Sequence, residues 1–263
     1  TNKVTQLIPD GLKDAYSQIR IHSLAAGDGK IFFSTIPGTE QLGGCIGWYD
    51  LQTKELYAER NVVEDQTIIS LVYEDGYLYG ASSVSNGTSS VATQTEAKVL
   101  VYDVANKASV GTYSVSSVTG SNEIKYVSGL AADPNYDTNG KIWGVVGQAL
   151  FSFTFNKETK EMSLKTEVSF SDDHDYTNSG SLNWFPRPIL FGQDGYMYAA
   201  FDEKGGTQRI DPKDPQGCHE KILDHFKNDH VPILVGTQMV AKGLNLPDVT
   251  LVGVLDADLS LYS

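Results

Sequence analysis

Apolar and polar residues alternate in short runs along the first four fifths of the chain, and turn residues separate the runs. One unit recurs: an apolar run, then Asp-Gly or Asn-Gly, then a run rich in aromatic residues. It occupies residues 23–35, 70–82, 129–145 and 189–201. Asp-Gly and Asn-Gly between alternating runs favour hairpin turns, because both residues of a two-residue turn need a positive φ. The pattern predicts four hairpins, with turns at Asp28-Gly29, Asp75-Gly76, Asn139-Gly140 and Asp194-Gly195.

A third strand that leaves into a tight turn follows each predicted hairpin. These strands begin the segments 45–56, 98–109, 149–162 and 205–214. A fourth strand follows in at least three units, for example at 108–116 and 162–170. Repeated units of four antiparallel strands, with turns 47, 64 and 55 residues apart, are typical of β-propeller blades. A β-sandwich built from hairpins is the alternative, but the repeated order of strands and turns favours the propeller.

The pattern changes from about Pro215 onward. Apolar residues at helical spacing predict a helix over 219–229, and the apolar runs 231–237 and 249–258 predict buried strands. This order is typical of a parallel α/β sheet. We therefore expect a mainly β protein, a propeller-like array of about four four-stranded blades with a short α/β segment. The expected divisions are a lead-in at 1–20, blades at 21–214 and the α/β segment at 215–263.

Composition agrees with a folded, strand-rich protein and narrows the range of partners. The 263 residues are 40% hydrophobic and 10% aromatic, and they carry a formal net charge of −13. Because this charge repels phosphate backbones and no cluster of Lys and Arg opposes it, we do not expect a nucleic-acid partner. No apolar run approaches the roughly 18 residues that a membrane span needs. We expect no membrane span and no cofactor, and the oligomeric state stays open.

The two cysteines, Cys45 and Cys218, lie far apart in the sequence and form no C-x-x-C pair. A cysteine zinc site is therefore not expected. Cys45 lies in a strand pattern and is expected to be a small buried apolar residue. A disulfide between the two cysteines stays open.

Two loops carry candidate residues for binding or catalysis. In "NWFPRP", the aromatic side chains stand next to a charged donor, which suits a sugar ring through stacking and hydrogen bonds; packing between blades is the alternative. The binding candidates are Trp184, Phe185 and Arg187. In "SDDHDY", carboxylates beside a histidine could act as acid and base or hold a metal; a solvated loop is the alternative. If the protein is an enzyme, the catalytic candidates are Asp172, Asp173, His174 and Asp175.

Two further loops resemble modification or metal sites. "DPNYDTNG" has oxygen-bearing side chains at alternate positions, as calcium loops do; a plain hairpin loop rich in Asn and Asp is the favoured alternative, because the bidentate Glu of an EF-hand is absent. The candidate calcium ligands are Asp133, Asn135, Asp137 and Asn139. Asn86-Gly87-Thr88, in the Ser/Thr-rich insertion 84–96, has the form of a glycosylation sequon.

The repeated units resemble blades of secreted or surface-associated bacterial propellers that accompany carbohydrate-active proteins. Residues 60–83, "RNVVEDQTIISLVYEDGYLYGASS", and residues 95–104 carry most of the resemblance. It covers about residues 20–214 and implies a propeller at the cell surface or outside the cell. Neither a nucleophile elbow nor another local catalytic motif accompanies these units.

The last 49 residues resemble the second RecA-like domain of primosomal replication-restart DNA helicases, the PriA family. The segment "ILVGTQMVAKGLNLPDVTLVGVLDAD" carries the resemblance. By motif position, it implies that Thr237, Gln238, Lys242 and Gly243 lie near DNA or nucleotide. The chain contains no phosphate-cradling Gly-x-x-x-x-Gly-Lys-Ser/Thr loop, so we do not expect helicase or ATPase activity. If this resemblance governs location, the protein is cytoplasmic.

Two different protein classes thus share one chain, as in a fusion or chimera. The leading hypothesis is a non-catalytic propeller that binds a carbohydrate or protein ligand through loops on one face. One alternative is a propeller polysaccharide lyase or glycosidase. The other is the remnant of an ATP-dependent primosomal DNA helicase, inactive in this chain.

Overall fold

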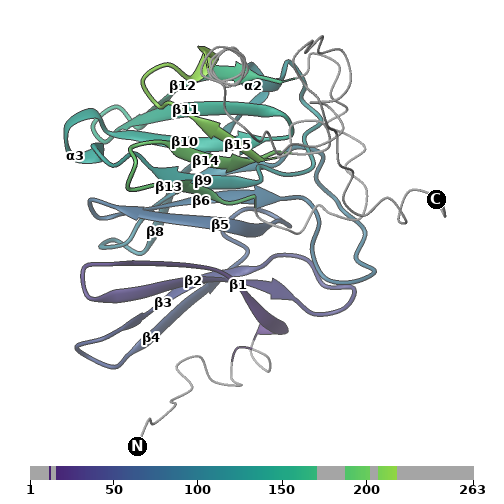
Figure 1. The fold of residues 1–263 in the computed structure, drawn as a ribbon. Helices are drawn as coiled ribbons and strands as arrows, with labels where there is room; N and C mark the ends of the chain where they lie inside the picture. The colour runs from purple at the N-terminus through teal and green to yellow at the C-terminus, as the bar shows by residue number, and fades with distance from the viewer. Residues whose placement is uncertain (1–11, 13–15, 171–186, 202–206, 218–263) are drawn as a thin grey trace, which may run out of the picture. The chain divides into compact units, whose positions relative to one another are not determined.

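A computed structural model places an array of antiparallel sheets in the first part of the protein (Figure 1). The chain divides into two compact units, residues 1–215 and 216–263. The structure describes residues 12, 16–170, 187–201 and 207–217. The second unit therefore lies almost wholly outside the described residues.

The described strands form four sheets, and in each sheet the strand order is the chain order. The first sheet contains β1 (Gln18–Gly27), β2 (Lys30–Pro37), β3 (Cys45–Asp50) and β4 (Leu56–Arg60). The second contains β5 (Thr67–Glu74), β6 (Tyr77–Ser83), β7 (Lys98–Asp103) and β8 (Ala108–Ser114). The third contains β9 (Gly129–Ala132), β10 (Lys141–Val146), β11 (Ala149–Asn156) and β12 (Glu161–Ser169). The fourth contains β13 (Ile189–Phe191), β14 (Met197–Ala200) and β15 (Thr207–Ile210). Short helical turns are α2 (Ser116–Thr119), α3 (Tyr136–Asn139) and η3 (Pro215–Gly217).

Successive sheets contact each other mainly through their first strands. β1 and β2 pack on β5, β5 packs on β9, and β9 contacts β13. Figure 1 shows the first three sheets one above another in chain order. The mainly β, four-bladed propeller arrangement predicted from the repeat is thus confirmed.

Two of the four predicted hairpin turns have the expected backbone. Asp28 and Gly29 have φ values of 43° and 70°, and Asp75 and Gly76 have 47° and 83°. Both residues of each pair therefore adopt the positive φ that a two-residue primed turn needs.

The other two turns differ from the prediction. The connection between β9 and β10 spans residues 133–140, which is long enough for the helical turn α3. Gly140 ends α3 in the left-handed conformation, and its N–H donates to the Tyr136 carbonyl. The connection between β13 and β14 spans 192–196, and only Gly195 has a positive φ there, at 81°. The prediction of two-residue turns at Asn139-Gly140 and Asp194-Gly195 was wrong. Both connections are longer, so two successive residues with positive φ are not needed to reverse the chain.

The turns after the third strands share one device. An Asp or Asn side chain at the strand end accepts hydrogen bonds from backbone N–H groups of the turn that follows. These bonds hold the turn in its conformation. The acceptors are Asp50, Asp103 and Asn156. Each turn then places a lysine at positive φ, and these are Lys54, Lys107 and Lys160.

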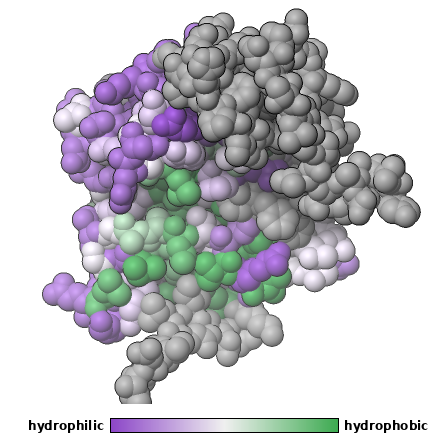
Figure 2. Space-filling view, in the orientation of Figure 1, coloured by the Kyte–Doolittle hydropathy of each residue, from purple (hydrophilic) through white to green (hydrophobic). Residues whose placement is uncertain are grey.

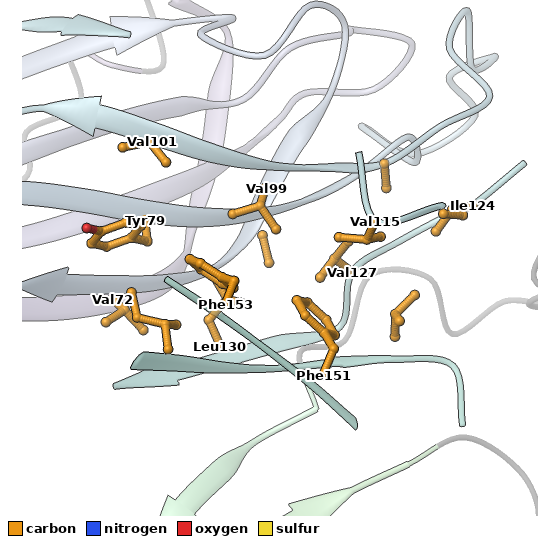
Figure 3. Packing of buried hydrophobic residues seen from close by; sticks show 14 of the residues in the cluster. Val72, Tyr79, Val99, Val101, Val115, Ile124, Val127, Leu130, Phe151 and Phe153 are labelled. Carbon is orange, nitrogen blue, oxygen red and sulfur yellow. The ribbon is translucent and has the colours of Figure 1, made fainter. Parts of the chain in front are cut away.

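Hydrophobic side chains fill the seams between neighbouring sheets. Between the first and second sheets, Phe32 and Trp48 pack with Leu71 and Tyr102. Between the second and third sheets, Tyr79 and Val99 face Phe151 and Phe153, as Figure 3 shows. Cys45 is a free thiol with no exposed surface, as predicted, and burial raises its pKa to about 11.

A repeated hydrogen bond joins the first strands of neighbouring sheets. The Leu71 N–H donates to Ser23 Oγ at 3.1 Å, and one sheet further on the Leu130 N–H donates to Ser70 Oγ at 3.1 Å. Both leucines are only 6% exposed. At each seam, the backbone N–H of a buried leucine thus donates to the hydroxyl of a serine in the preceding sheet.

This repeat predicts that Ser70→Ala weakens the array. The Leu130 N–H would lose its acceptor in a buried seam, which costs about 1–3 kcal/mol of unfolding free energy. Chemical denaturation followed by tryptophan fluorescence measures this loss. Ser109→Ala, at an exposed position of β8, is the matched control and should change stability by less than about 0.5 kcal/mol. Equal effects of the two variants would contradict a role of the hydroxyl in the seam.

Candidate binding site

Most site residues predicted from the sequence lie outside the described residues. These are Asp172, Asp173, His174, Asp175, Trp184, Phe185, Thr237, Gln238, Lys242 and Gly243. Arg187 is described and half-buried, and its N–H donates to the Ser128 carbonyl at 2.7 Å. Its backbone thereby joins the third sheet to the chain that enters the fourth, and its role in binding stays a prediction.

In the predicted calcium loop, hydrogen bonds converge on Asp133. Its Oδ1 accepts from the Asn135 N–H at 2.8 Å and from the side-chain amides of Asn135 and Asn139, and its Oδ2 accepts from Trp143 Nε1 at 2.8 Å. Burial alone would raise the pKa of Asp133, but these hydrogen bonds outweigh it and hold the pKa below its ordinary value. Asp137 is exposed on α3. Among the described residues, no three His, Cys, Asp or Glu side chains gather as a metal site, and the calcium interpretation stays a prediction.

The sequon asparagine is part of the fold. Asn86 is 1% exposed; its Oδ1 accepts from the Gly43 N–H at 2.9 Å and from Thr67 Oγ1 at 3.0 Å. Its Nδ2 donates to the carbonyls of Asp65 and Val84. The side chain fastens the 84–96 insertion to the first sheet, so it is not available to a glycan in the folded protein.

An open depression of about 710 Å³ lies where turns of the second and third sheets meet. The β5–β6 turn, α3 and the turn between β11 and β12 form its walls. The lining residues are Asp75, Tyr136, Asp137, Thr138, Gly140, Phe155, Asn156, Lys157 and Glu158.

Aromatic side chains form the apolar part of the depression. Phe155 meets Tyr77 edge to face with ring centroids 5.7 Å apart, and meets Tyr113 in the same manner at 6.0 Å. The Tyr136 hydroxyl lies 3.1 Å from the Tyr79 hydroxyl. Both Phe155 and Tyr136 are half-buried, so neighbouring rings hold them in place while part of each surface faces solvent.

Charged groups surround these rings. Lys157 Nζ forms an ion pair with Asp75 and donates to the Asp75 carbonyl at 3.2 Å; it also lies 5.2 Å from the Tyr77 ring centroid. Next to this pair, burial raises the pKa of Glu74, and the negative charges of Asp137 and Asp75 raise it further. Lys160 Nζ also lies 5.8 Å from the Tyr77 ring centroid, so lysine and carboxylate groups stand side by side around these rings.

One large residue differs between the two equivalent seams. Tyr73 lies two residues after Leu71 and fills the equivalent seam between the first and second sheets. Its ring stacks on Phe32 at 4.5 Å, its hydroxyl donates to Asp28 Oδ2 at 2.5 Å, and a Cβ on Gly27 would lie 2.1 Å from its ring. Ala132, two residues after Leu130, occupies the same position in the third sheet.

Sequence reasoning missed this depression, although alignment of the repeats held a signal. The unit that contains Tyr73 and the unit that contains Ala132 differ at a position that faces the preceding sheet. The position holds a tyrosine in one unit and an alanine in the other. The polar lining could not be found in the same way, because Asp75 and Lys157 are 82 positions apart.

Comparison with known families places the helicase resemblance at the end of the chain. The model of the helicase conserved C-terminal domain matches residues 194–263. Replication restart protein PriA of Bacillus subtilis is 53% identical over 53 residues, which are 20% of this chain and 7% of that protein. PriA of Synechocystis is 51% identical over 43 residues, 16% of this chain and 5% of that protein. The resemblance predicted for this stretch is confirmed, and the chain spans less than a tenth of the length of these relatives.

Solved structures similar to this chain include a luciferin-regenerating enzyme and YCF48 bound to D1 peptide. The first is 12% identical, with a TM-score of 0.44, and the match covers 74% of this chain and 59% of that chain. The second is 13% identical, with a TM-score of 0.43, and the match covers 72% and 50%. Within the described residues, no helix has the length and apolar character needed to cross a membrane. The helicase match and the β-sheet array together support the interpretation that the chain joins two protein classes.

The hydrogen bonds to Asp133 predict a pH dependence of stability. Because the folded pKa lies below the ordinary value of about 3.9, the stability that ionised Asp133 contributes is fully present above that value. It is lost as the pH falls through the folded pKa. The gap in unfolding free energy between the wild type and Asp133→Asn should therefore shrink below about pH 4. Denaturant titrations at several pH values measure the gap, with exposed Glu123→Gln as control. A gap that is constant from pH 3 to pH 7 would contradict the assignment.

Proposed function

We propose that the sheet array is a non-catalytic binding module that takes a carbohydrate in the depression between the second and third sheets. The observation that carries the proposal is the position of Phe155 and Tyr136 beside charged and amide groups in one open site. Neighbouring rings fix both aromatic side chains, so little conformational freedom would be lost on binding.

The lining suits the two chemical faces of a sugar. A pyranose ring presents an apolar C–H face, which packs on an aromatic ring, and a set of hydroxyls, which donate and accept hydrogen bonds. In the depression, Phe155 and Tyr136 provide the aromatic surface. Asp137 and Glu158 provide acceptors and Lys157 provides a donor. The depression is open, which suits one or two residues of a longer chain.

The catalytic alternative is a propeller lyase or glycosidase. It would rely on Asp172, Asp173, His174 and Asp175, which lie outside the described residues. One experiment distinguishes binding from catalysis. Chromatography of the polysaccharide after incubation with the protein shows whether the polysaccharide has been cleaved. A variant with alanine at all four positions should keep binding under our proposal, and there should be no cleavage for it to lose.

The test of binding is calorimetric titration with a panel of neutral, acidic and amino oligosaccharides. Lys157→Ala should weaken the best ligand about tenfold, since a hydrogen bond to a charged group contributes about 1.5–3 kcal/mol. Ala132→Tyr should abolish binding, because it places a tyrosine where Tyr73 closes the neighbouring seam.

Lys98→Ala is the matched control for this test. Lys98 also forms an ion pair, with Glu96 at 3.9 Å, but it lies outside the depression. This variant should bind like the wild type. If no member of the panel binds, or if Lys157→Ala and Ala132→Tyr bind normally while remaining folded, the proposed site is refuted.

For the C-terminal stretch, we expect no ATP turnover. The chain contains no phosphate-cradling loop, and the nucleotide needs one to be held for hydrolysis. An ATPase assay with and without single-stranded DNA should give the background rate in both cases. DNA-stimulated turnover that is lost in Lys242→Ala would instead support the helicase alternative.

A further inference from the structure

The depression between the second and third sheets is lined by more acidic than basic groups. The carboxylates of Asp75, Asp137 and Glu158 stand there against a single ammonium group, that of Lys157. Figure 2 shows hydrophilic residues gathered at the upper left of the view, where Figure 1 places α3. The charge of the lining is therefore a property that a ligand has to match.

The two lysines of this region already have acidic neighbours. Lys157 forms its ion pair with Asp75. Lys160 lies near Asp103: hydrogen bonds from Asn106 lower the pKa of Asp103, and the positive charge of Lys160 lowers it further. Each lysine charge is thus offset by a carboxylate of its own.

Three carboxylates in and beside the depression form no ion pair with any of the described residues. They are Glu74, Asp137 and Glu158. Asp137 and Glu158 are exposed, whereas Glu74 is half-buried. Burial raises the pKa of Glu74 first, and the nearby charges of Asp137 and Asp75 raise it further. A cation placed among these groups would relieve the repulsion between them.

The aromatic part of the site also favours a positive charge. The Nζ atoms of Lys157 and Lys160 lie 5.2 and 5.8 Å from the Tyr77 ring centroid. An aromatic ring attracts a cation because its π electrons make its face negative. Phe155 and Tyr136 are half-buried members of the lining, so a ligand in the depression meets rings of the same kind.

We infer that the depression selects a sugar that carries a protonated primary amine over neutral and acidic sugars. The inference rests on the proposed carbohydrate binding and narrows its ligand to an amino sugar. Such a ligand joins one positive charge to an apolar C–H face, so it matches both the carboxylates and the rings. Asp137 and Glu158 accept hydrogen bonds from the ammonium group, and Lys157 donates to a hydroxyl. An acidic sugar would instead add negative charge to a negative site.

Tetramers of β-1,4-linked glucosamine, N-acetylglucosamine and glucose test the selection, because they differ only in the substituent on the second carbon of each ring. The full chain is titrated with each by calorimetry at about pH 6, where primary amines are protonated. At low salt, the glucosamine tetramer should bind at least about tenfold more tightly than the other two, since hydrogen bonds between ionised groups are the stronger ones. The preference should shrink at about 1 M salt, where the Debye length falls to about 3 Å.

Two substitutions remove a charge from the site and keep a hydrogen-bond acceptor. Asp137→Asn and Glu158→Gln should each weaken the glucosamine tetramer about three- to tenfold and change the glucose tetramer by less than about twofold. Glu123→Gln is the matched control, because it removes the same charge at an exposed position outside the depression. It should change neither affinity. Circular dichroism and thermal unfolding verify that the variants are folded.

Lys157→Ala gives a separate check on the charge argument. It removes a hydroxyl donor that serves every sugar, but it also leaves the Asp75 carboxylate without its cation. The ratio of glucosamine to glucose affinity should therefore rise in this variant. A lower ratio contradicts the inference.

The outcomes distinguish charge selection from binding itself. If the glucose or N-acetylglucosamine tetramer binds as tightly as the glucosamine tetramer, the amino-sugar inference is overturned and carbohydrate binding stands. Binding of acidic members of the panel alone has the same consequence, and so do equal effects of Glu158→Gln and Glu123→Gln. If no sugar binds, the binding module itself is refuted, and the inference falls with it.

Discussion

The contact between the first strand of one sheet and the first strand of the next is the interaction on which the rest of the array depends. At this contact, Leu71 and Leu130 bury their side chains and donate their N–H groups to Ser23 and Ser70. A four-stranded sheet with two apolar faces cannot remain alone in water, because burial of apolar surface contributes about 25 cal/mol per Å². Repetition of one contact therefore stabilises the whole series. It also follows that the first sheet has an apolar face with no predecessor in the described array.

The same seam that stabilises the array also provides its candidate site. Between the first and second sheets, Tyr73 fills the space over Gly27, and its hydroxyl reaches Asp28. Between the second and third sheets, Ala132 holds the equivalent position, and Asp75 of the second sheet pairs with Lys157 of the third. A repeat protein can thus vary one inward-facing side chain without altering the backbone contact. The leucine and serine pairs stabilise the seam, whereas the candidate binding residues lie at neighbouring positions. The two sets of residues can therefore change independently.

The sequence predicted those parts of the fold whose determinants are local. Strand alternation and the Asp28-Gly29 and Asp75-Gly76 turns follow from residues next to one another, and the strands and turns appear as predicted. The Asn139-Gly140 turn was wrong because the Asp133 side chain organises a longer loop, and its Trp143 partner lies on the next strand. The depression was missed because its walls come from different sheets. Local patterns describe each blade, whereas a site between blades depends on how repeats face one another.

In the helicase-like stretch, the sequence similarity is strong, but the structure and activity that it implies depend on the rest of a helicase domain. The family model matches from residue 194, yet β14 and β15, inside that range, pair antiparallel with each other and β14 pairs antiparallel with β13. The pattern over 231–258 predicts buried strands of a parallel sheet instead. The first part of the matched range therefore belongs to the fourth sheet. A Gly-Thr-Gln-x-x-x-Lys-Gly segment couples ATP hydrolysis to movement only where a phosphate loop and arginines surround the nucleotide, so the activity of a helicase does not follow from the segment alone.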